Sequence, residues 1–330
     1  MGKTTATHGS RYQSLAYVGS LALSALLPLD LSAQTRPEVR LWQEALPYYN
    51  PAASIAVEGG QLAALYGHTD SRHKYYLILG GMPLELLGGQ HEVGAQLLYH
   101  QQDLWEQTAL SARGTLSLPL SLTQSLRLGV ETTFYRLSFD GKRAQEEGIT
   151  DQELPTTKTE GKAFDLSLGA YYTGRRLSAG IAVTDLLGSS VALSERYRAE
   201  TNPLYVAFLR YRIDLGKSLA LQPTAFASYS KPSAWRKELG ASISYQDRFS
   251  LGASYRFHHI WTAHTSISLG SLRLGYLLEQ DTRSQGSPIY RHEFFLGYTL
   301  PLNQGSKIIL RMNESHKIIH NFARKYIDFS

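Results

Sequence analysis

The chain has 330 residues, no cysteine, 28 glycines, 21 tyrosines and a formal net charge of +5. Its composition, 43% hydrophobic and 18% charged, excludes a disordered or collagen-like chain, and a mean hydropathy of −0.24 is far from that of a helical membrane protein. Without cysteine there is neither a disulfide framework nor a thiolate metal site, and the basicity is too diffuse to indicate a nucleic-acid partner.

The first 33 residues have the organisation of a secretory signal peptide. Two basic residues, Lys3 and Arg11, precede an apolar stretch at 15–29, and small residues lie before a cleavage point near Ala33. A buried N-terminal helix is the alternative interpretation. We expect an exported protein whose leader, residues 1–33, is removed and is followed by an N-terminal periplasmic segment, residues 34–53.

Beyond the leader, the dominant pattern is alternation of apolar and polar residues. Residues 249–257 alternate without an error, and residues 239–245 do the same. A period of two predicts β-strands with one apolar face and one polar face.

The length of these runs indicates what the apolar faces contact. Most cover about eight to twelve residues, enough for a tilted strand to cross a bilayer, whereas strands of soluble sandwiches average about five or six. The polar faces carry small residues and scattered charges, as expected in a barrel lumen: Arg127, Glu131, Asp165 and Arg273. Tyrosine and tryptophan recur near strand ends, where amphipathic rings favour the headgroup level. A soluble β-rich sheet is the alternative.

The sequence therefore predicts an all-β fold, a single-chain antiparallel transmembrane outer-membrane β-barrel of about 14 strands over residues 54–300. The strands are predicted to begin near Ser54, Arg72, Val93, Trp105, Gln124, Phe164, Leu177, Leu204, Ser218, Trp235, Phe249, Trp261, Ser271 and Arg291.

Loop lengths support this interpretation. Connections after even-numbered strands are mostly tight, whereas residues 139–163, 185–203 and 281–290 form long connections after odd-numbered strands. Outer-membrane barrels alternate short periplasmic turns with longer outer loops in this way. Residues 82–92 are the exception, a longer segment on the predicted periplasmic side. The charged segment 139–163 is interpreted as a hydrated surface loop, with a recognition role as the alternative.

A series of short motifs is spread over residues 45–300. They are Asn50-Pro51-Ala52, Phe139-Asp140, Gln222-Pro223, Gly252 with Tyr255 and Arg256, Gly275-Tyr276, His292-Glu293, and Gly297-Tyr298. In order and spacing these motifs resemble the PorP/SprF family, outer-membrane barrels of the type IX secretion system of Bacteroidota. One departure is Arg291, where the family usually has serine before the His-Glu pair.

This resemblance implies a non-enzymatic docking or adaptor subunit in the outer membrane. It would couple the translocon, or the C-terminal signal domains of cargo, to periplasmic ring and peptidoglycan-associated proteins in protein secretion and gliding motility. The alternative, from the transport class, is an outer-membrane pore for passive or substrate-specific passage of small or hydrophobic solutes.

The motif residues themselves favour mostly structural roles. Asn50-Pro51 suits a turn that delivers the chain into its first strand, with a docking motif for a periplasmic partner as the alternative. Three glycines are expected on the polar faces of their strands, where a missing side chain lets the wall bend or another backbone approach: Gly252, Gly275 and Gly297. Two charged residues are expected to point into the lumen: Arg256 and Glu293.

We find no catalytic, cofactor-binding or metal-ligating constellation in the sequence. The densest histidine group, His258, His259 and His264, has no carboxylate or cysteine at metal-ligand spacing. Nucleophile-elbow, phosphate-loop and zinc-helix motifs are also absent from the sequence. We therefore expect no enzyme and no cofactor.

The last segment, residues 301–330, changes its period. Apolar residues and one serine recur at steps of four and three and predict one face of a basic helix: Ile308, Met312, Ser315, Ile319, Phe322 and Tyr326. Such a helix would dock on the periplasmic side or on anionic headgroups. A frayed terminus is the alternative.

Overall fold

The computed structural model describes residues 36–54, 59–86, 89–149, 154–194, 197–231, 235–257, 259–282, 288–301 and 308–309. The chain divides into two compact units, Met1–Ala33 and Gln34–Ser330, and all of the described residues belong to the second. The predicted leader, His258 and most of the predicted basic tail lie outside the described residues.

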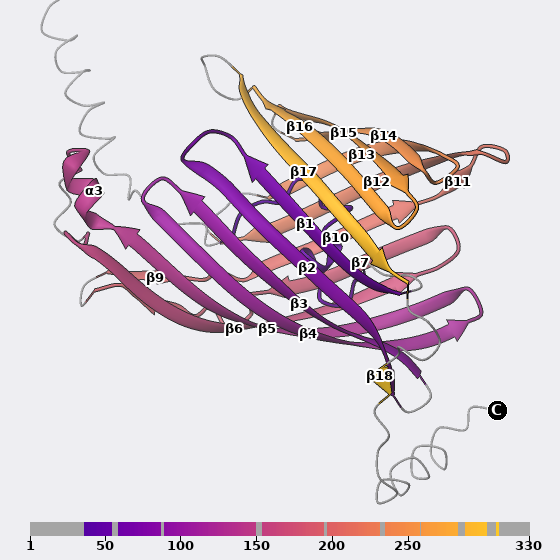
Figure 1. Ribbon diagram of the computed structural model, residues 1–330, viewed down its shortest axis with the longest axis horizontal. Coiled ribbons are helices and arrows are strands. Elements are labelled where there is room, and N and C mark those ends of the chain that lie inside the picture. Colours follow the sequence, from indigo (N-terminus) through magenta and orange to yellow (C-terminus); the bar gives the residue numbers. More distant parts are fainter. Residues whose placement is uncertain are drawn as a thin grey trace, which may run out of the picture. The chain divides into compact units, whose positions relative to one another are not determined.

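Fourteen antiparallel strands form a closed barrel (Figure 1). Their bounds are β1 (Gly60–His68), β2 (His73–Leu86), β3 (Gly89–Gln102), β4 (Trp105–Ser121), β5 (Gln124–Asp140), β6 (Lys158–Thr173), β7 (Leu177–Thr184), β10 (Leu204–Tyr211), β12 (Leu219–Ser230), β13 (Arg236–Tyr245), β14 (Phe249–Arg256), β15 (Ile260–Leu269), β16 (Leu272–Asp281) and β17 (Ile289–Leu300). The barrel closes because β1 pairs with both β2 and β17, so that Ala63 lies opposite Leu79 on one side and Gly297 on the other. The predicted fold class is confirmed.

A few shorter elements accompany these fourteen strands. They are α2 (Leu46–Tyr49), α3 (Gly141–Glu146), the hairpin β8 (Ser190–Ala192) and β9 (Arg198–Glu200), β11 (Ile213–Asp214) and β18 (Ile308–Ile309). β18 pairs in parallel with Leu84 and Glu85 at the end of β2. No helix in the described part of the chain is long and apolar enough to cross a bilayer.

Most strands begin within two residues of the predicted positions, but one predicted segment is wrong. Residues 82–92 do not form a long connection, because β2 continues to Leu86 and β3 begins at Gly89. Pro83 is tolerated there because the pairing of β2 with β1 ends at Gly81, so no ladder with β1 needs its missing N–H. β6 also begins earlier than predicted, at Lys158, which shortens the expected loop 139–163.

The two faces of the wall differ as the alternation predicts. Along β13, Arg236 and Glu238 are buried inside the barrel, whereas Leu239 is exposed on the outer face. The four charges predicted for the lumen all face inward. Glu131 and Asp165 are fully buried there, Arg127 pairs with Glu92 at 3.2 Å, and Arg273 pairs with Glu44 at 2.6 Å.

The two ends of the barrel are unlike each other. At one end, here called the turn end, strands are joined by residues 87–88, 122–123, 174–176, 212–218, 246–248 and 270–271. At the other, the loop end, the connections include 141–157, which carries α3, and 185–203, which carries the β8–β9 hairpin. The two longest connections therefore both lie at the loop end, as the loop pattern predicts.

The connection 185–203 is fixed against β6. The carboxylate of Asp165 accepts hydrogen bonds from Leu187 N (2.8 Å) and from the Thr201 hydroxyl (2.6 Å). The β8–β9 hairpin then packs Val191 into a buried apolar cluster with Leu137 and Phe139. Leu137 and Phe139 stand at inward positions of β5, so the hairpin covers part of the inner wall at the loop end.

Candidate functional site: a plugged lumen

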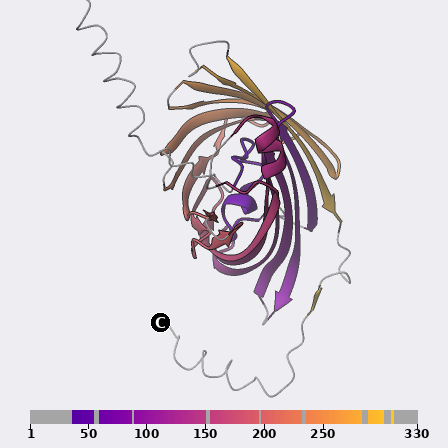
Figure 2. The same cartoon turned by 90° about the vertical axis from the view of Figure 1, so that its left-hand side faces the viewer.

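Residues 36–53, here called the plug, lie inside the barrel (Figure 2). Its side chains Val39, Trp42, Ala45 and Tyr48 are at most 1% exposed. From the sequence we expect a periplasmic segment at residues 34–53, whereas the described part of this segment lies inside the lumen. A barrel of this width encloses more space than its own inward side chains occupy, and this segment places apolar and charged groups in that space.

The middle of the plug is held by aromatic packing. The Trp42 ring centroid lies 5.1 Å from that of Phe226 and 6.0 Å from that of Phe208, and the Tyr49 ring meets Phe226 edge-on at 5.2 Å. Burial of each large apolar side chain contributes about 1.5–3 kcal/mol. The plug is therefore packed like a protein core.

The Asn50-Pro51-Ala52 motif lies against the backbone of the wall. The Asn50 amide donates to the carbonyls of Ala170 (2.9 Å) and Ile181 (3.2 Å), which face each other across β6 and β7. Its own oxygen accepts from Ala52 N at 2.9 Å, which closes a local turn. The Pro51 carbonyl accepts from Thr115 at 2.9 Å.

Glycines allow this close approach. A Cβ added at Gly169 would lie 2.1 Å from the Asn50 side-chain oxygen, and one added at Gly129 would lie 2.3 Å from Ala52 N. Only residues without a side chain can lie beneath the motif at these two positions. The motif therefore fixes the end of the plug in the wall just before the chain turns toward β1.

Glu293 holds the opposite side of the plug. Its two carboxylate oxygens accept from the backbone N–H groups of Arg40 (2.7 Å) and Leu41 (2.6 Å), and the side chain is 2% exposed. A carboxylate that accepts two backbone hydrogen bonds in a buried site makes a strong anchor. The predicted inward position of Glu293 is where the structure places it.

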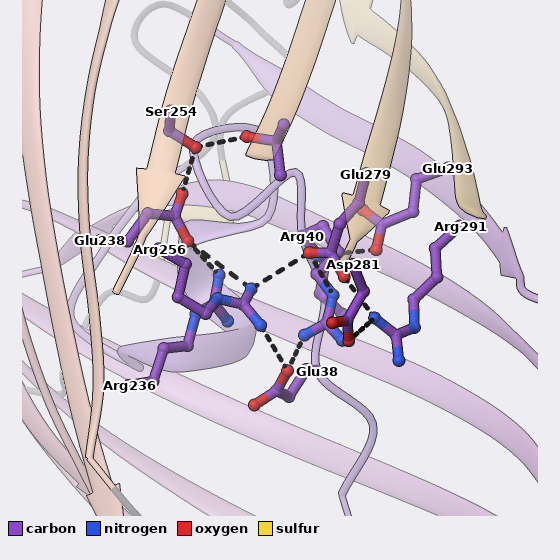
Figure 3. A network of polar contacts seen from close by, with 12 residues as sticks. Glu38, Arg40, Arg236, Glu238, Ser254, Arg256, Glu279, Asp281, Arg291 and Glu293 are labelled. Atoms are coloured by element: carbon purple, nitrogen blue, oxygen red, sulfur yellow. Dashed lines mark hydrogen bonds and ion pairs between the residues drawn. The ribbon is translucent and has the colours of Figure 1, made fainter. Parts of the chain in front are cut away.

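A buried network of ion pairs surrounds this anchor (Figure 3). The Glu279 carboxylate lies 3.0 Å from Arg40, 3.4 Å from Arg256 and 2.6 Å from Arg291, and its residue is fully buried. Arg291 also reaches Asp281 at 3.3 Å. Arg291, the residue before the His292-Glu293 pair, therefore supplies a cation to this network.

A second carboxylate continues the network toward β13. Glu238 accepts from Arg236 at 2.8 Å, from the Ser254 hydroxyl at 2.8 Å and from the Trp42 indole N–H at 3.2 Å. Arg256 lies between this carboxylate and the plug, and it bonds to Glu38 at 3.0 Å. Strands β13, β14, β16 and β17 thus hold the plug through charges.

A smaller polar cluster lies on β3 to β5. Arg113 bonds to Glu92 at 2.7 Å and donates to the carbonyl of Ala53 at 2.8 Å. At the start of the plug, Arg36 lies 3.5 Å from Asp185 and donates to the carbonyl of Tyr48 at 3.0 Å. The two ends of the plug are therefore tied to different strands and to the connection 185–203.

The remaining predicted motif residues lie apart from the plug or beside it. Gly252 is covered by the His264 ring, and Gly275 and Gly297 are covered by Phe295. Phe139 packs on Trp105 with ring centroids 4.8 Å apart, and the Asp140 carboxylate accepts from Arg143 N at the start of α3.

The other motif side chains are distributed over both faces. Gln222 lines the lumen near the turn end, whereas Pro223 lies on the outer face opposite Ala241. The outer face also carries Tyr298 and two aromatic contacts near the loop end: Tyr255 with Trp261, ring centroids 4.5 Å apart, and the Tyr276 hydroxyl with His292 Nδ1 at 2.9 Å. The motifs thus do not converge on one site.

Several residues that hold the plug were not singled out from the sequence. They are Arg40, Trp42, Arg236, Glu238 and Glu279. Glu238 and Glu279 could have been found because each stands at an inward position of an alternating strand, where a buried acid requires a cation. Trp42 gave no comparable signal.

The plug separates two cavities. One, of about 770 Å³, opens at the loop end and is lined by Arg36 and Arg40 from the plug and by His73, Tyr75 and Arg291 from the wall. The other, of about 230 Å³, lies near the turn end and is lined by Glu44 from the plug and by Gln222, His264 and Arg273 from the wall. Within the described part of the chain, no group of three or more His, Cys, Asp or Glu side chains could hold a metal ion.

An apolar outer face, a closed antiparallel wall and a polar, filled lumen define an outer-membrane β-barrel. The family described as "Type IX secretion system membrane protein PorP/SprF" matches residues 31–298, so the chain belongs to that family. No curated protein matches the chain.

Solved outer-membrane barrels resemble it at low identity. Omp33 of Acinetobacter baumannii is 9% identical over 74% of this chain and 98% of its own, with a TM-score of 0.44. The deltaS2S3 mutant of the monoaromatic hydrocarbon channel TodX is 9% identical over 77% and 93%, with a TM-score of 0.48. The toluene transporter TbuX of Ralstonia pickettii is 12% identical over 76% and 91%, with a TM-score of 0.46.

Proposed function

We propose that this type IX secretion barrel is a non-enzymatic docking subunit, which presents its two ends to other components of the secretion system. The observation that carries the proposal is the plug. A lumen filled by the chain's own residues and tied by buried ion pairs favours a role for the barrel's surfaces over a role for its bore.

Loop lengths assign the turn end to the periplasm, because outer-membrane barrels have short periplasmic turns. Three neighbouring turns at this end carry exposed cations with no acidic partner among the described residues: Arg175, Arg176, Lys217 and Arg248. Such a basic rim favours an acidic protein surface as partner. The periplasmic ring and peptidoglycan-associated subunits are the candidates on this side, with the translocon or cargo signal domains at the loop end.

Affinity purification from cell envelopes tests the docking role. Reversing two charges of the rim, in Arg175→Glu with Arg176→Glu, is expected to reduce co-purification of periplasmic subunits and to impair cargo secretion. The matched control is Lys142→Glu, an exposed change in α3 at the loop end. Equal recovery of all subunits with both variants, together with normal secretion, would contradict the proposal.

Conductance in planar bilayers separates docking from the pore alternative. The native barrel is expected to be silent, and loss of cargo secretion in a deletion strain with silent bilayers supports docking. A robust open channel in the native protein, with secretion unaffected by deletion, would instead assign solute transport.

We also propose that the leader is cleaved near Ala33. N-terminal sequencing of the protein purified from outer membranes is expected to start near Gln34. An intact Met1 would contradict this assignment.

A further inference from the structure

An apolar groove crosses the outer face of the barrel over β6, β7, β10, β12 and β13. Its volume is about 690 Å³. Alanines form much of its floor, and large apolar side chains at neighbouring outward positions form its sides. In one row across the wall, Ala170 lies opposite Ile181, which lies opposite Ala207, then Ala227 and Lys237.

The groove is inclined to the barrel axis. Lys237 is the second residue of β13, which starts at the loop end, whereas Ala170 lies three residues before the turn-end terminus of β6. Four steps between strands about 4.8 Å apart, in a wall tilted by about 40°, span about 12 Å along the axis. The apolar band of such a barrel is about 25 Å tall, so the groove spans about half of the height of this band.

A cation stands at the loop-end limit of this groove. Lys237 is exposed on the outer face, and its ammonium lies 5.8 Å from the centroid of the Trp235 ring. The described residues give this lysine no carboxylate partner. Tryptophan favours the headgroup level of a bilayer, which places the ammonium where lipid phosphates lie.

We propose that the groove holds an acyl chain of an anionic membrane lipid, whose phosphate pairs with Lys237. The groove lies on the apolar face of an outer-membrane barrel, so hydrocarbon surrounds it, and alanines leave room in its floor between larger apolar side chains. Lys237, the exposed cation at the groove's rim, complements a phosphate rather than an apolar protein surface. This binding is independent of the docking role, because the groove lies on the lipid-facing side of the strands and is not formed by the connections at either end.

Native mass spectrometry of the purified full chain in detergent tests the proposal, with dioleoyl phosphatidylglycerol and dioleoyl phosphatidylcholine as probes. Filling the floor, in Ala207→Leu or Ala227→Leu, is expected to lower retention of both lipids several-fold. Lys237→Gln is expected to remove the preference for phosphatidylglycerol, about fivefold for one lysine, and to leave phosphatidylcholine unchanged.

The control is Ala253→Leu, an outward alanine of β14 that lies outside the groove. Heat-modifiable migration on SDS gels verifies that each variant is folded, and Lys237→Gln tests the phosphate contact without filling any space. Equal lipid retention by Ala207→Leu and Ala253→Leu, or an unchanged preference in Lys237→Gln, would overturn the proposal. Loss of a co-purifying protein with unchanged lipid retention would reassign the groove to a protein contact.

Discussion

The plug meets the barrel wall in two physically different ways. On β5 to β7, here called the glycine side, Asn50, Pro51 and Ala52 lie directly on backbone atoms above Gly129 and Gly169. On β13 to β17, the charged side, buried carboxylates and arginines hold residues 38–42.

The difference between the two sides is one of tolerance. On the glycine side the fit of Asn50, Pro51 and Ala52 depends on the absence of side-chain atoms, so any added side chain would collide with the plug. On the charged side each group is buried with its partners, so the loss of one leaves others unpaired in a poorly solvated site. Substitutions on each side therefore test different physical causes of the same closed state.

The largest effect is expected on the charged side. Glu279→Ala leaves three arginines without their shared carboxylate and should lower the free energy of unfolding by about 3–5 kcal/mol. The temperature at which the folded band disappears on SDS gels should fall accordingly. Glu106→Ala is the control, because its pair with Lys158 at 3.1 Å is exposed and such pairs contribute about 1 kcal/mol or less. Equal shifts for both variants would show that burial of the network is unimportant.

The glycine side should respond to a single methyl group. Gly169→Ala places a Cβ 2.1 Å from the Asn50 side chain and should cost about 1–3 kcal/mol through overpacking. Gly114→Ala is the matched control, since a Cβ there meets nothing within 4 Å. The same gel assay compares them. A neutral Gly169→Ala would mean that the plug is not seated on the wall at this point.

Polar contact on the glycine side is expected to matter less than shape. Asn50→Ala removes the donor to two strand carbonyls and should cost about 0.5–1.5 kcal/mol for each net hydrogen bond. Asn50→Asp should be worse at neutral pH, because a carboxylate would face those carbonyl oxygens, and its deficit should shrink as the pH falls and the acid becomes protonated. The stability of both variants against unfolding in detergent is measured at pH 7 and at pH 4. An Asn50→Asp deficit that grows as the pH falls would contradict the contact of Asn50 with the two carbonyls.

How far the fold follows from sequence depends on the range of the interactions. The strands are predictable because alternation is a local signal. The alternation from Leu239 to Tyr245, for example, is enough to identify β13. The close approach expected above Gly252 is also found, with the His264 ring in place of a backbone. The failure at residues 82–92 arose because Pro83 is a local signal against a strand, whereas the ladder from β3 stabilises the strand there.

The plug could not be predicted in the same way. Its residues 36–53 have no strand or helix period, and the bond from Arg40 N to Glu293 joins positions 253 residues apart. The sequence indicated that Glu293 points inward, but the partner was visible only once the wall was closed. Asn50-Pro51-Ala52 was recognised as a motif, yet its contacts with Ala170 and Ile181 depend on the register of β6 and β7.

The smallest effect is expected for an exposed ion pair at the turn end. Arg212 holds the Asp247 carboxylate with bonds of 2.7 and 3.2 Å, and these hydrogen bonds lower the pKa of Asp247 below its ordinary value of 3.8. Both side chains are more than a third exposed, so the pair should contribute less than about 1 kcal/mol. Because the folded-state pKa is lowered, this stability is present above pH 3.8 and is lost as the pH falls through the lowered pKa.

Arg212→Gln should move the pKa of Asp247 back toward 3.8 in an NMR titration, with little change in unfolding at pH 7. A loss of unfolding free energy as large as that of Glu279→Ala would contradict this comparison. It would mean that the strength of these ion pairs does not depend on whether they are exposed, as here, or buried, as on the charged side.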